Sequence, residues 1–324
     1  MKAWDIFYKN VCQNDFVGAR DKIVLSVSGG IDSVCMLHMF WRLAKKININ
    51  FLVVNFDHNL REESLKEANV VKNLSAKFGI ECVLEKISVK EYSRSHSVSV
   101  ETAGRELRYL TLEKIATKYN CNKIAIAHNA NDNAETVIMW LLRGTGNFAG
   151  IPQKREVNKK IVIIRPLLPI KRKLIEEYVK SHNLQFCVDK SNFSDIYTRN
   201  KIRFSLMPIF EKINPMFVEH IFDLSCIQNR ENAYLEEISI NLLKKCVKTK
   251  RNQILLDLTM FLRYNKVMQF RILKNILPQN KYSSHINFIM HKILSSDKSI
   301  YKLSSDWVFK MKSDKACFVK KRKL

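Results

Sequence analysis

The sequence predicts an α/β fold built on a parallel sheet, followed by a smaller α+β domain. Short apolar runs of strand type alternate with segments of helical periodicity through the first part of the chain. Such alternation is typical of a parallel sheet covered by helices on both faces. The pattern changes at Asn214-Pro215, because an Asn-Pro pair disfavours continued regular structure. We therefore expect one domain over residues 1–215 and a second over residues 216–324.

Each element of the first domain follows from a local pattern. The expected strands are Ile23–Val27, Phe51–Phe56, Cys82–Ile87, Lys123–Ala127 and Ile161–Ile164. Helices are expected after the first strand and over about Glu62–Phe78, Glu101–Tyr119 and Asn131–Arg143. Ligands of such sheets collect at the carboxyl ends of the strands. The polar stretches that follow the first, second and fourth strands should therefore face one crevice.

The second domain combines a helical segment with short strands. Apolar residues from Ile221 to Leu242 recur at helical spacing, which predicts a long helix. Strand-like pieces follow at Ser299–Leu303, Trp307–Met311 and Cys317–Val319, separated by polar turns. We expect a basic, mainly helical domain with short strands near its end.

The charge balance points to a polyanionic partner. The chain has 55 Lys and Arg against 31 Asp and Glu, a net charge of +24, and a pI near 9.7. A surface this positive attracts nucleic acid, although a lysine-rich coding bias would give the same number. The composition, 46% hydrophobic and 27% charged, is that of a folded chain.

The cysteines and the N-terminus indicate a cytoplasmic protein. Eight cysteines are scattered and none forms a CxxC pair, which disfavours a zinc site, an iron–sulfur site or a disulfide scaffold. The first residues lack the apolar core of a signal peptide, and no apolar run is long enough to span a bilayer. We expect reduced thiols and no membrane association.

A glycine-containing loop follows the first strand and is the candidate phosphate site. It comprises Ser28, Gly29, Gly30, Ile31, Asp32 and Ser33. Paired glycines let the backbone approach a ligand, and the amides that open the next helix favour an anion. Asp32 would repel a bare phosphate, so we expect it to hold the Mg²⁺ that screens pyrophosphate. The loop lacks the lysine of a Walker A motif, and an ordinary capped turn is the alternative.

This loop resembles the SGGxDS signature of the PP-loop, or N-type ATP pyrophosphatase, family. The resemblance implies an adenine nucleotide α-hydrolase-like catalytic domain over residues 1–215 that uses ATP and Mg²⁺. Members cleave ATP between its α- and β-phosphates and transfer AMP to a carbonyl-type oxygen.

Further motifs resemble the lysidine synthase branch of that family. They are Asn55–Arg61 (HxDHGLR), Gly104–Tyr109 (ARxxRY), Ala127–Thr136 (AHHxDDQxET), Ile164–Leu168 (RPLL), and Asp189–Asn192 with Thr198–Arg203 (DxSN…RNxIR). The chain departs from the pattern at Asn55, Asn59, Gly104 and Asn131, and its loop over residues 144–151 is short.

The resemblance assigns roles to matching residues. It implies catalytic roles for Asp32, Arg105, His128 and Asp132, with Asp32 as the metal ligand. It implies nucleotide binding by Ser28, Gly29, Gly30, Ile31, Asp32, Ser33, Asp57 and His58. It implies tRNA binding by Arg108, Arg143, Arg199, Asn200 and Arg203. Asp132 either shares the metal with Asp32 or assists the attacking amine. An ordinary capping histidine is the alternative for His128, and an exposed basic helix face is the alternative for Arg105 and Arg108.

The implied reaction joins free L-lysine to C2 of the wobble cytidine in a tRNA(Ile) with a CAU anticodon. An adenylated cytidine is the intermediate, and lysidine, AMP and pyrophosphate are the products. The second domain would bind the tRNA body, and a homodimer is a further expectation. Three alternatives remain: a PP-loop tRNA thiolase, a PP-loop amidotransferase, and a non-catalytic RNA-binding relic. The motifs identify neither the lysine pocket nor a general base.

Overall fold

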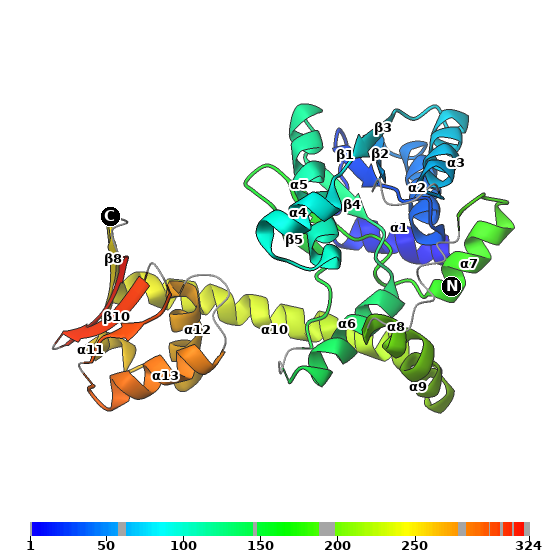
Figure 1. Ribbon diagram of the computed structural model, residues 1–324. Helices are drawn as coiled ribbons and strands as arrows, with labels where there is room; N and C mark the ends of the chain where they lie inside the picture. The colour runs from blue at the N-terminus through cyan, green and yellow to red at the C-terminus, as the bar shows by residue number, and fades with distance from the viewer. Residues whose placement is uncertain are drawn as a thin grey trace. The chain divides into compact units, whose positions relative to one another are not determined.

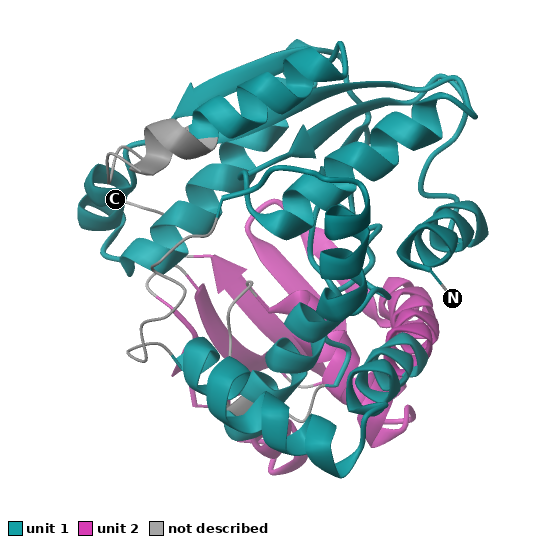
Figure 2. Ribbon diagram, turned by 90° about the vertical axis from the view of Figure 1, so that its right-hand side faces the viewer, with its two compact units in different colours: residues 1–227 teal, residues 228–324 magenta. Residues whose placement is uncertain are grey.

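The chain forms two compact units, Met1–Ile227 and Gln228–Leu324 (Figures 1 and 2). The computed structural model describes residues 2–57, 63–144, 148–187, 198–277, 283–297, 299–304, 307–312 and 314–320. The division between the units falls within the long helix α10 (Phe217–Cys246). The domain boundary expected at residue 215 lies just before this helix and stays a prediction.

A six-stranded sheet forms the centre of the first unit, with strand order β3-β2-β1-β4-β6-β5. The parallel strands are β1 (Lys22–Ser26), β2 (Asn50–Asp57), β3 (Cys82–Lys86), β4 (Lys123–Ile126) and β6 (Val162–Ile164). The expected parallel sheet is thus confirmed. The edge strand β5 (Lys154–Glu156) runs antiparallel to β6 and was not predicted, because its three exposed polar residues carry no apolar signal.

Alternate residues of the central strands face two separate cores. Ile23, Leu25 and Val53 pack in one core, whereas Val24 and Leu52 pack in the other. This burial of both faces explains why the strands read as continuous apolar runs. The first core is covered by α1 (Ala3–Gln13), α2 (Ile31–Ala44), α3 (Glu63–Lys77) and α7 (Arg172–Ser181). Helix α5 (Val100–Lys118), which α4 (Val89–His96) contacts, covers the second core on the opposite side of the sheet (Figure 1).

A smaller cluster joins α6 to the segment before the long helix. It packs α6 (Ala130–Leu142) with the π-helical turn η2 (Ile202–Leu206), α9 (Met207–Ile213) and the start of α10. The short helix α8 (Thr198–Lys201) leads directly into η2. Helix α6 was expected over about Asn131–Arg143, whereas η2 was not foreseen, because a π turn has no distinctive residue pattern.

Gly150 anchors the loop after α6. Its φ of +57° is in the left-handed region, and an added Cβ would lie 2.1 Å from Oδ1 of Asn133. Asn133 is fully buried on α6, accepts a hydrogen bond from the Ile151 amide at 2.7 Å and donates to Ser225 Oγ at 3.0 Å. The glycine therefore permits a close approach that any side chain would prevent.

The second unit is an antiparallel sheet with helices on one face (Figure 2). Its strand order is β7 (Val247–Lys250), β8 (Gln253–Asp257), β11 (Lys315–Lys320), β10 (Trp307–Lys312) and β9 (Tyr301–Lys302). Buried Leu256, Phe309 and Phe318 pack with residues of α11 (Leu258–Phe261), α12 (Lys266–Ile276) and α13 (Ser283–Leu294). The expected α+β domain is confirmed. The β7–β8 pair was missed because its first strand is mostly exposed lysine and threonine.

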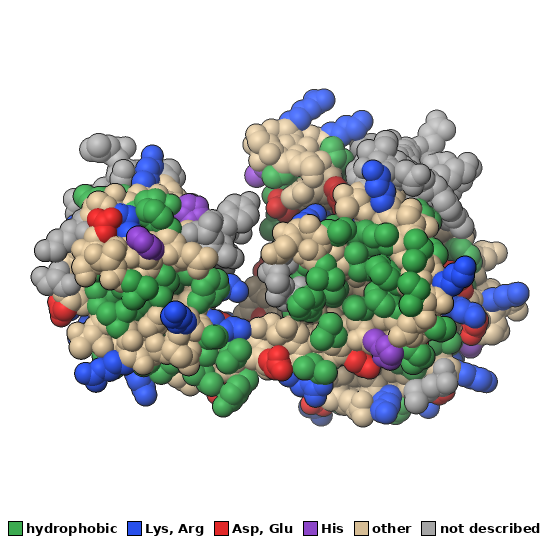
Figure 3. All heavy atoms as spheres, turned by 90° about the horizontal axis from the view of Figure 1, so that it is seen from below, with side chains coloured by type: hydrophobic (Ala, Val, Ile, Leu, Met, Phe, Trp, Pro, Cys, Tyr) green, Lys and Arg blue, Asp and Glu red, His purple; other side chains and the backbone are tan. Residues whose placement is uncertain are grey.

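Not all large apolar side chains of the first unit are buried. Figure 3 shows hydrophobic side chains gathered on one of its faces, on the side where α9 lies in Figure 1. Ile209 and Ile213 of α9 are 54% and 77% exposed. Among the helices of the described ranges, none is long and apolar enough to cross a lipid bilayer.

Candidate active site

The loop between β1 and α2 has the geometry of an anion site. Gly29 has a φ of +92°, and Gly30 caps α2 with no side chain of its own. The first amides of a helix have no carbonyl partner within that helix, so they are available to a ligand. Ser33 Oγ donates to the Gly30 carbonyl at 2.8 Å and accepts from the Ser28 amide at 3.2 Å. The serine hydroxyls therefore hold the loop in shape.

Asp32, in the first turn of α2, has partners on two other elements. Asn129 Nδ2 donates to its Oδ1 at 3.0 Å, and Arg172 Nη1 forms an ion pair with its Oδ2. Burial, together with nearby Asp132, raises the pKa of Asp32 to about 6, although Arg172 acts in the opposite direction. Asp32 thus changes charge close to neutral pH.

The turn that opens α6 ties a second carboxylate to the first. Asn129 Oδ1 accepts from the Asp132 amide, and Asp132 Oδ2 accepts from the Asn129 amide, both at 3.0 Å. Asn129 therefore holds both carboxylates, because its backbone amide binds Asp132 and its side-chain amide binds Asp32. Burial would raise the pKa of Asp132, but Arg199 and other cationic neighbours outweigh it and hold the pKa below its ordinary value. Asp132 therefore stays ionised over the pH range in which Asp32 gains its proton.

Two arginines neutralise the carboxylates of α6. Arg199 donates to Asp132 Oδ1 at 2.9 Å and to Glu135 Oε2 at 2.7 Å. Arg203 donates to Glu135 Oε1 at 2.7 Å and Oε2 at 3.0 Å, and to Asp132 Oδ1 at 3.3 Å. Glu135 is 1% exposed, so its charge depends on these guanidinium groups. Arg199 belongs to α8 and Arg203 to η2, so both reach α6 from consecutive helical turns.

His128 lies beside a buried arginine. Arg165 Nε donates to His128 Nδ1 at 3.2 Å, and its Nη1 donates to the Pro152 carbonyl at 2.6 Å. Burial, together with neighbouring guanidinium groups, lowers the pKa of His128 to about 3, although Asp132 opposes the shift. The imidazole is therefore neutral, with its proton on Nε2.

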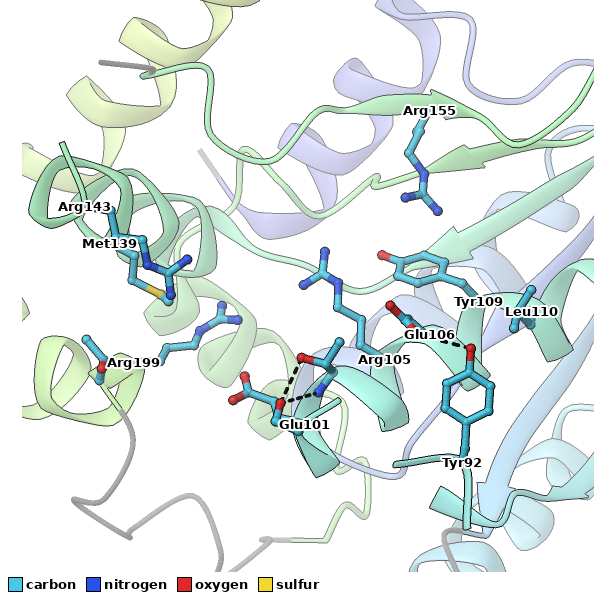
Figure 4. Close-up of a pocket in the computed structure, with 13 residues that line it drawn as sticks. Tyr92, Glu101, Arg105, Glu106, Tyr109, Leu110, Met139, Arg143, Arg155 and Arg199 are labelled. Atoms are coloured by element: carbon cyan, nitrogen blue, oxygen red, sulfur yellow. Dashed lines mark hydrogen bonds between the residues drawn. The ribbon is translucent and has the colours of Figure 1, made fainter. Parts of the chain in front are cut away.

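A cavity of about 850 Å³ opens in the first unit between α4, α5, α6, β5 and α8 (Figure 4). Arg105, Arg143, Arg155 and Arg199 line it. Two carboxylates, Glu101 and Glu106, also line it, and Glu106 accepts a hydrogen bond from Tyr92 at 3.2 Å.

Three of these four arginines have no carboxylate partner among the described residues, unlike Arg199 and Arg203. Arg199 is paired with Asp132 and Glu135, whereas Arg105, Arg143 and Arg155 pair with no carboxylate in the parts of the chain that the structure describes. With four arginines against two glutamates, the cavity wall is positive, which suits an anionic ligand.

The carboxylates fit a magnesium ion that arrives with a nucleotide. Mg²⁺ takes oxygen ligands, keeps several waters, and is commonly held by one or two carboxylates together with phosphates. Asp32 and Asp132 supply such a pair beside the loop, tied together by Asn129. Within the described ranges there is no cluster of three or more His, Cys, Asp or Glu that would hold a metal unaided.

The structure brings several of the residues predicted from the sequence together and separates others. Arg105, Arg143 and Arg199 line one cavity. Arg108 is half-buried on α5 and does not line it, while Asn200 is 8% exposed, so RNA contacts by both stay predictions.

Two of the expected nucleotide contacts cannot be placed. Asp57 is the last residue of β2, at the carboxyl edge of the sheet, but its side chain lies outside the described residues. His58 also lies outside them, as do residues 189–192 of the DxSN motif.

Comparison with known proteins decides the family. A PP-loop domain matches residues 5–210. The tRNA(Ile)-lysidine synthase of Clostridium acetobutylicum is 32% identical over 325 residues, covering 95% of this chain and 70% of that protein. This chain belongs to the tRNA(Ile)-lysidine synthase family.

Other relatives with this name are longer than the region they share with the chain. The Thermosipho africanus protein is 38% identical over 235 residues, which cover 70% of this chain and 54% of the relative. The Clostridium perfringens protein is 36% identical over 286 residues, which cover 87% of this chain and 60% of the relative. The chain thus spans little more than half the length of these relatives.

A solved structure shares the fold. A U34-tRNA thiolase from Methanococcus maripaludis, solved with its [4Fe-4S] cluster, has a TM-score of 0.60. It is 18% identical, and the match covers 69% of this chain and 77% of the thiolase. At this identity the likeness establishes the fold alone.

Four residues of the site were not predicted from the sequence. Glu135 lies three positions after Asp132 in a motif of the family, so helical spacing could have placed both on one face. Arg172 opens α7, where a helix ordinarily favours acidic residues, and that mismatch was a usable signal. Arg165 belongs to the RPLL motif, whereas nothing in the sequence distinguished Arg155 of β5.

Proposed function

We propose that this chain catalyses ATP-dependent attachment of free L-lysine to C2 of the wobble cytidine in a tRNA(Ile) with a CAU anticodon. One observation carries the proposal: a phosphate loop with two linked carboxylates and a cavity lined by arginines occur in one catalytic unit of this family. The phosphate loop with its carboxylates suits ATP, and the arginine-lined cavity suits the RNA that accepts AMP.

In the first step, the phosphates of ATP lie at the first turn of α2. Mg²⁺ held by Asp32 and Asp132 would screen the pyrophosphate as its charge develops. The cytidine O2 attacks the α-phosphorus, the bond to the bridging oxygen breaks, and pyrophosphate leaves. Arg172, which is paired with Asp32, lies where it would contact this charge.

In the second step, the ε-amine of lysine attacks C2 of the adenylated cytidine. The bond between C2 and the oxygen of AMP breaks, AMP leaves, and the amine loses a proton. The amine attacks in its neutral form, and Asp132, which stays ionised beside Arg199, would accept a hydrogen bond from its N–H. His128 is neutral, which favours a role as a hydrogen-bond donor through Nε2 over a role as an imidazolium acid.

RNA binding would use both units. The arginine-lined cavity would take the anticodon, where unpaired bases can be splayed out. The second unit, residues 228–324, has 21 Lys and Arg against 7 Asp and Glu, which suits the phosphates of the tRNA body. A cytoplasmic location follows from these substrates, and the homodimer stays a prediction.

A tRNA thiolase is the strongest competing function, because one shares this fold. That enzyme was solved with an iron–sulfur cluster, whereas this chain contains no CxxC pair. An RNA-binding relic would not need to keep both Asp32 and Asp132 beside the loop.

Lysine transfer tests the proposal. The protein is incubated with Mg-ATP, radiolabelled lysine and an unmodified tRNA(Ile) transcript with a CAU anticodon, and label in the RNA is counted. We expect label that requires ATP and disappears when the wobble cytidine is replaced by uridine. ATP-dependent release of pyrophosphate with this RNA but without lysine transfer would refute the proposed nucleophile and favour the thiolase.

A further inference from the structure

We propose that Arg155 and Tyr109 form a stacking platform for an unpaired base of the anticodon that neighbours the reacting cytidine. The platform rests on the proposed function for the identity of the RNA. Its position and shape come from the cavity itself, which both residues line (Figure 4).

The two side chains come from different elements, and the guanidinium lies over the ring. Tyr109 belongs to α5 and Arg155 to β5, and the guanidinium carbon of Arg155 lies 4.4 Å from the centroid of the tyrosine ring. Arg105 lies 5.7 Å from the same centroid. A planar guanidinium stacked on an aromatic ring is itself a flat cationic surface, on which nucleobases stack readily.

Buried contacts hold the ring in place before any ligand binds. Arg165 is 2% exposed and donates to the Tyr109 hydroxyl at 3.4 Å. Burial would raise the pKa of Tyr109, but Arg165, Arg105 and Arg155 outweigh it and hold the pKa below its ordinary value. The ring is thus fixed and polarised by cations, which reduces the conformational cost of stacking a ligand.

Arg155 is free to make the contact. It is exposed on the edge strand, and it pairs with no carboxylate of the described ranges. A guanidinium needed only for packing would be expected to have fixed hydrogen-bond partners, as Arg165 has. Figure 4 shows the Arg155 side chain extending from β5 toward Tyr109.

The cavity favours RNA over a small metabolite. Its volume of about 850 Å³ is near the upper end of small-molecule sites, so it holds more than one amino acid or base. Arg105 and Arg143 supply positive charge for phosphates, while the Arg155–Tyr109 pair supplies a plane for a base. Charge for the backbone beside a stacking surface is the pattern of single-stranded nucleic acid sites.

A fluorescent base tests the platform. The probe is an anticodon stem-loop RNA in which 2-aminopurine replaces the adenine at the middle of the CAU anticodon, because stacking quenches its fluorescence. The Arg155→Lys variant keeps the charge and removes the plane. We expect it to bind the RNA within about threefold of the wild type but to lose most of the quenching.

Control variants separate stacking from charge and from folding. Lys159→Ala removes an exposed charge from the same hairpin outside the cavity and should leave quenching unchanged. Tyr109→Phe keeps the ring and should retain quenching, whereas Tyr109→Leu should lose it. Equal quenching by the wild type and Arg155→Lys would overturn the platform.

Parallel lysine-transfer assays distinguish failure of the platform from failure of the proposed function. Normal lysine transfer with quenching that does not depend on Arg155 refutes the platform alone. Failure of the wild-type protein both to quench the probe and to transfer lysine to the full transcript refutes the proposed function and the platform together.

Discussion

Arginine has opposite roles in two regions of the catalytic unit. Beside α6, Arg199 and Arg203 are tied to the carboxylates of Asp132 and Glu135. In the wall of the cavity, Arg143 at the end of α6 and Arg155 on β5 pair with no carboxylate of the described residues. The first set neutralises buried charge, and the second leaves positive charge available to a ligand.

This difference shows that a count of basic residues does not identify a nucleic-acid surface. The family resemblance implied RNA contacts for Arg143, Arg199 and Arg203 alike. In the structure, Arg203 forms ion pairs with Asp132 and Glu135. Arg199 belongs to both regions, because it lines the cavity while it binds Asp132.

The largest expected effect tests whether the phosphate loop acts separately from the arginine-lined cavity. Asp32→Asn removes the proposed metal ligand but keeps the size of the side chain, so pyrophosphate release should fall by about 10³-fold. Binding of the tRNA transcript should change by less than about twofold, because Asp32 lies outside the cavity. Asp223→Asn, an exposed substitution on α10, is the matched control. Unchanged pyrophosphate release by Asp32→Asn would refute the metal site.

The next effect tests whether the arginines beside α6 are structural. Glu135→Gln leaves Arg199 and Arg203 without their most buried partner, and it should reduce the free energy of unfolding by about 2–4 kcal/mol. Glu176→Gln breaks an exposed pair with Arg172 and should cost less than about 0.5 kcal/mol. Denaturant titration of both variants measures the difference. Equal losses of unfolding free energy would show that the buried pairs of Glu135 contribute no more than the exposed pair of Glu176.

A smaller effect is expected in the cavity. Arg143→Ala removes an unpaired charge, so affinity for the tRNA transcript should fall by about three- to tenfold. The slope of log affinity against log salt concentration should become shallower by about one. Lys159→Ala should change neither the affinity nor the slope. Filter-binding titrations over a range of salt concentrations provide the test. A loss of stability without a loss of RNA affinity would place Arg143 with the structural arginines.

The last effect, which concerns pH, is similar in size to that of Arg143→Ala. The pKa of Asp32 is raised from 3.8 to about 6, so the native state holds its proton to higher pH than the unfolded chain does. Its contribution to the free energy of unfolding should therefore decrease as pH rises from about 4 to 6. Mg-ATP binding requires the ionised carboxylate and should weaken by about tenfold between pH 7 and pH 5. Calorimetric titrations should show this dependence for the wild type and not for Asp32→Asn.

The sequence predicted what depends on local pattern and missed what depends on tertiary contact. The strands, the phosphate loop and helix α6 follow from apolar periodicity and from the glycines at positions 29 and 30. The pairing of Arg203 with Glu135 depends on a π-helical turn that no residue pattern marks. Arg155 could not be identified because it lies on a short polar strand, and only the folded chain brings it to Tyr109.

The central claim is that ATP activates a base of the bound RNA before lysine attacks. The most direct measurement uses ATP radiolabelled at the α-phosphate, with the CAU transcript and without lysine. We predict label attached to the RNA at the wobble cytidine, and its release as AMP when lysine is added. RNA that stays unlabelled while lysine is transferred, or label that persists after lysine is added, would contradict the account.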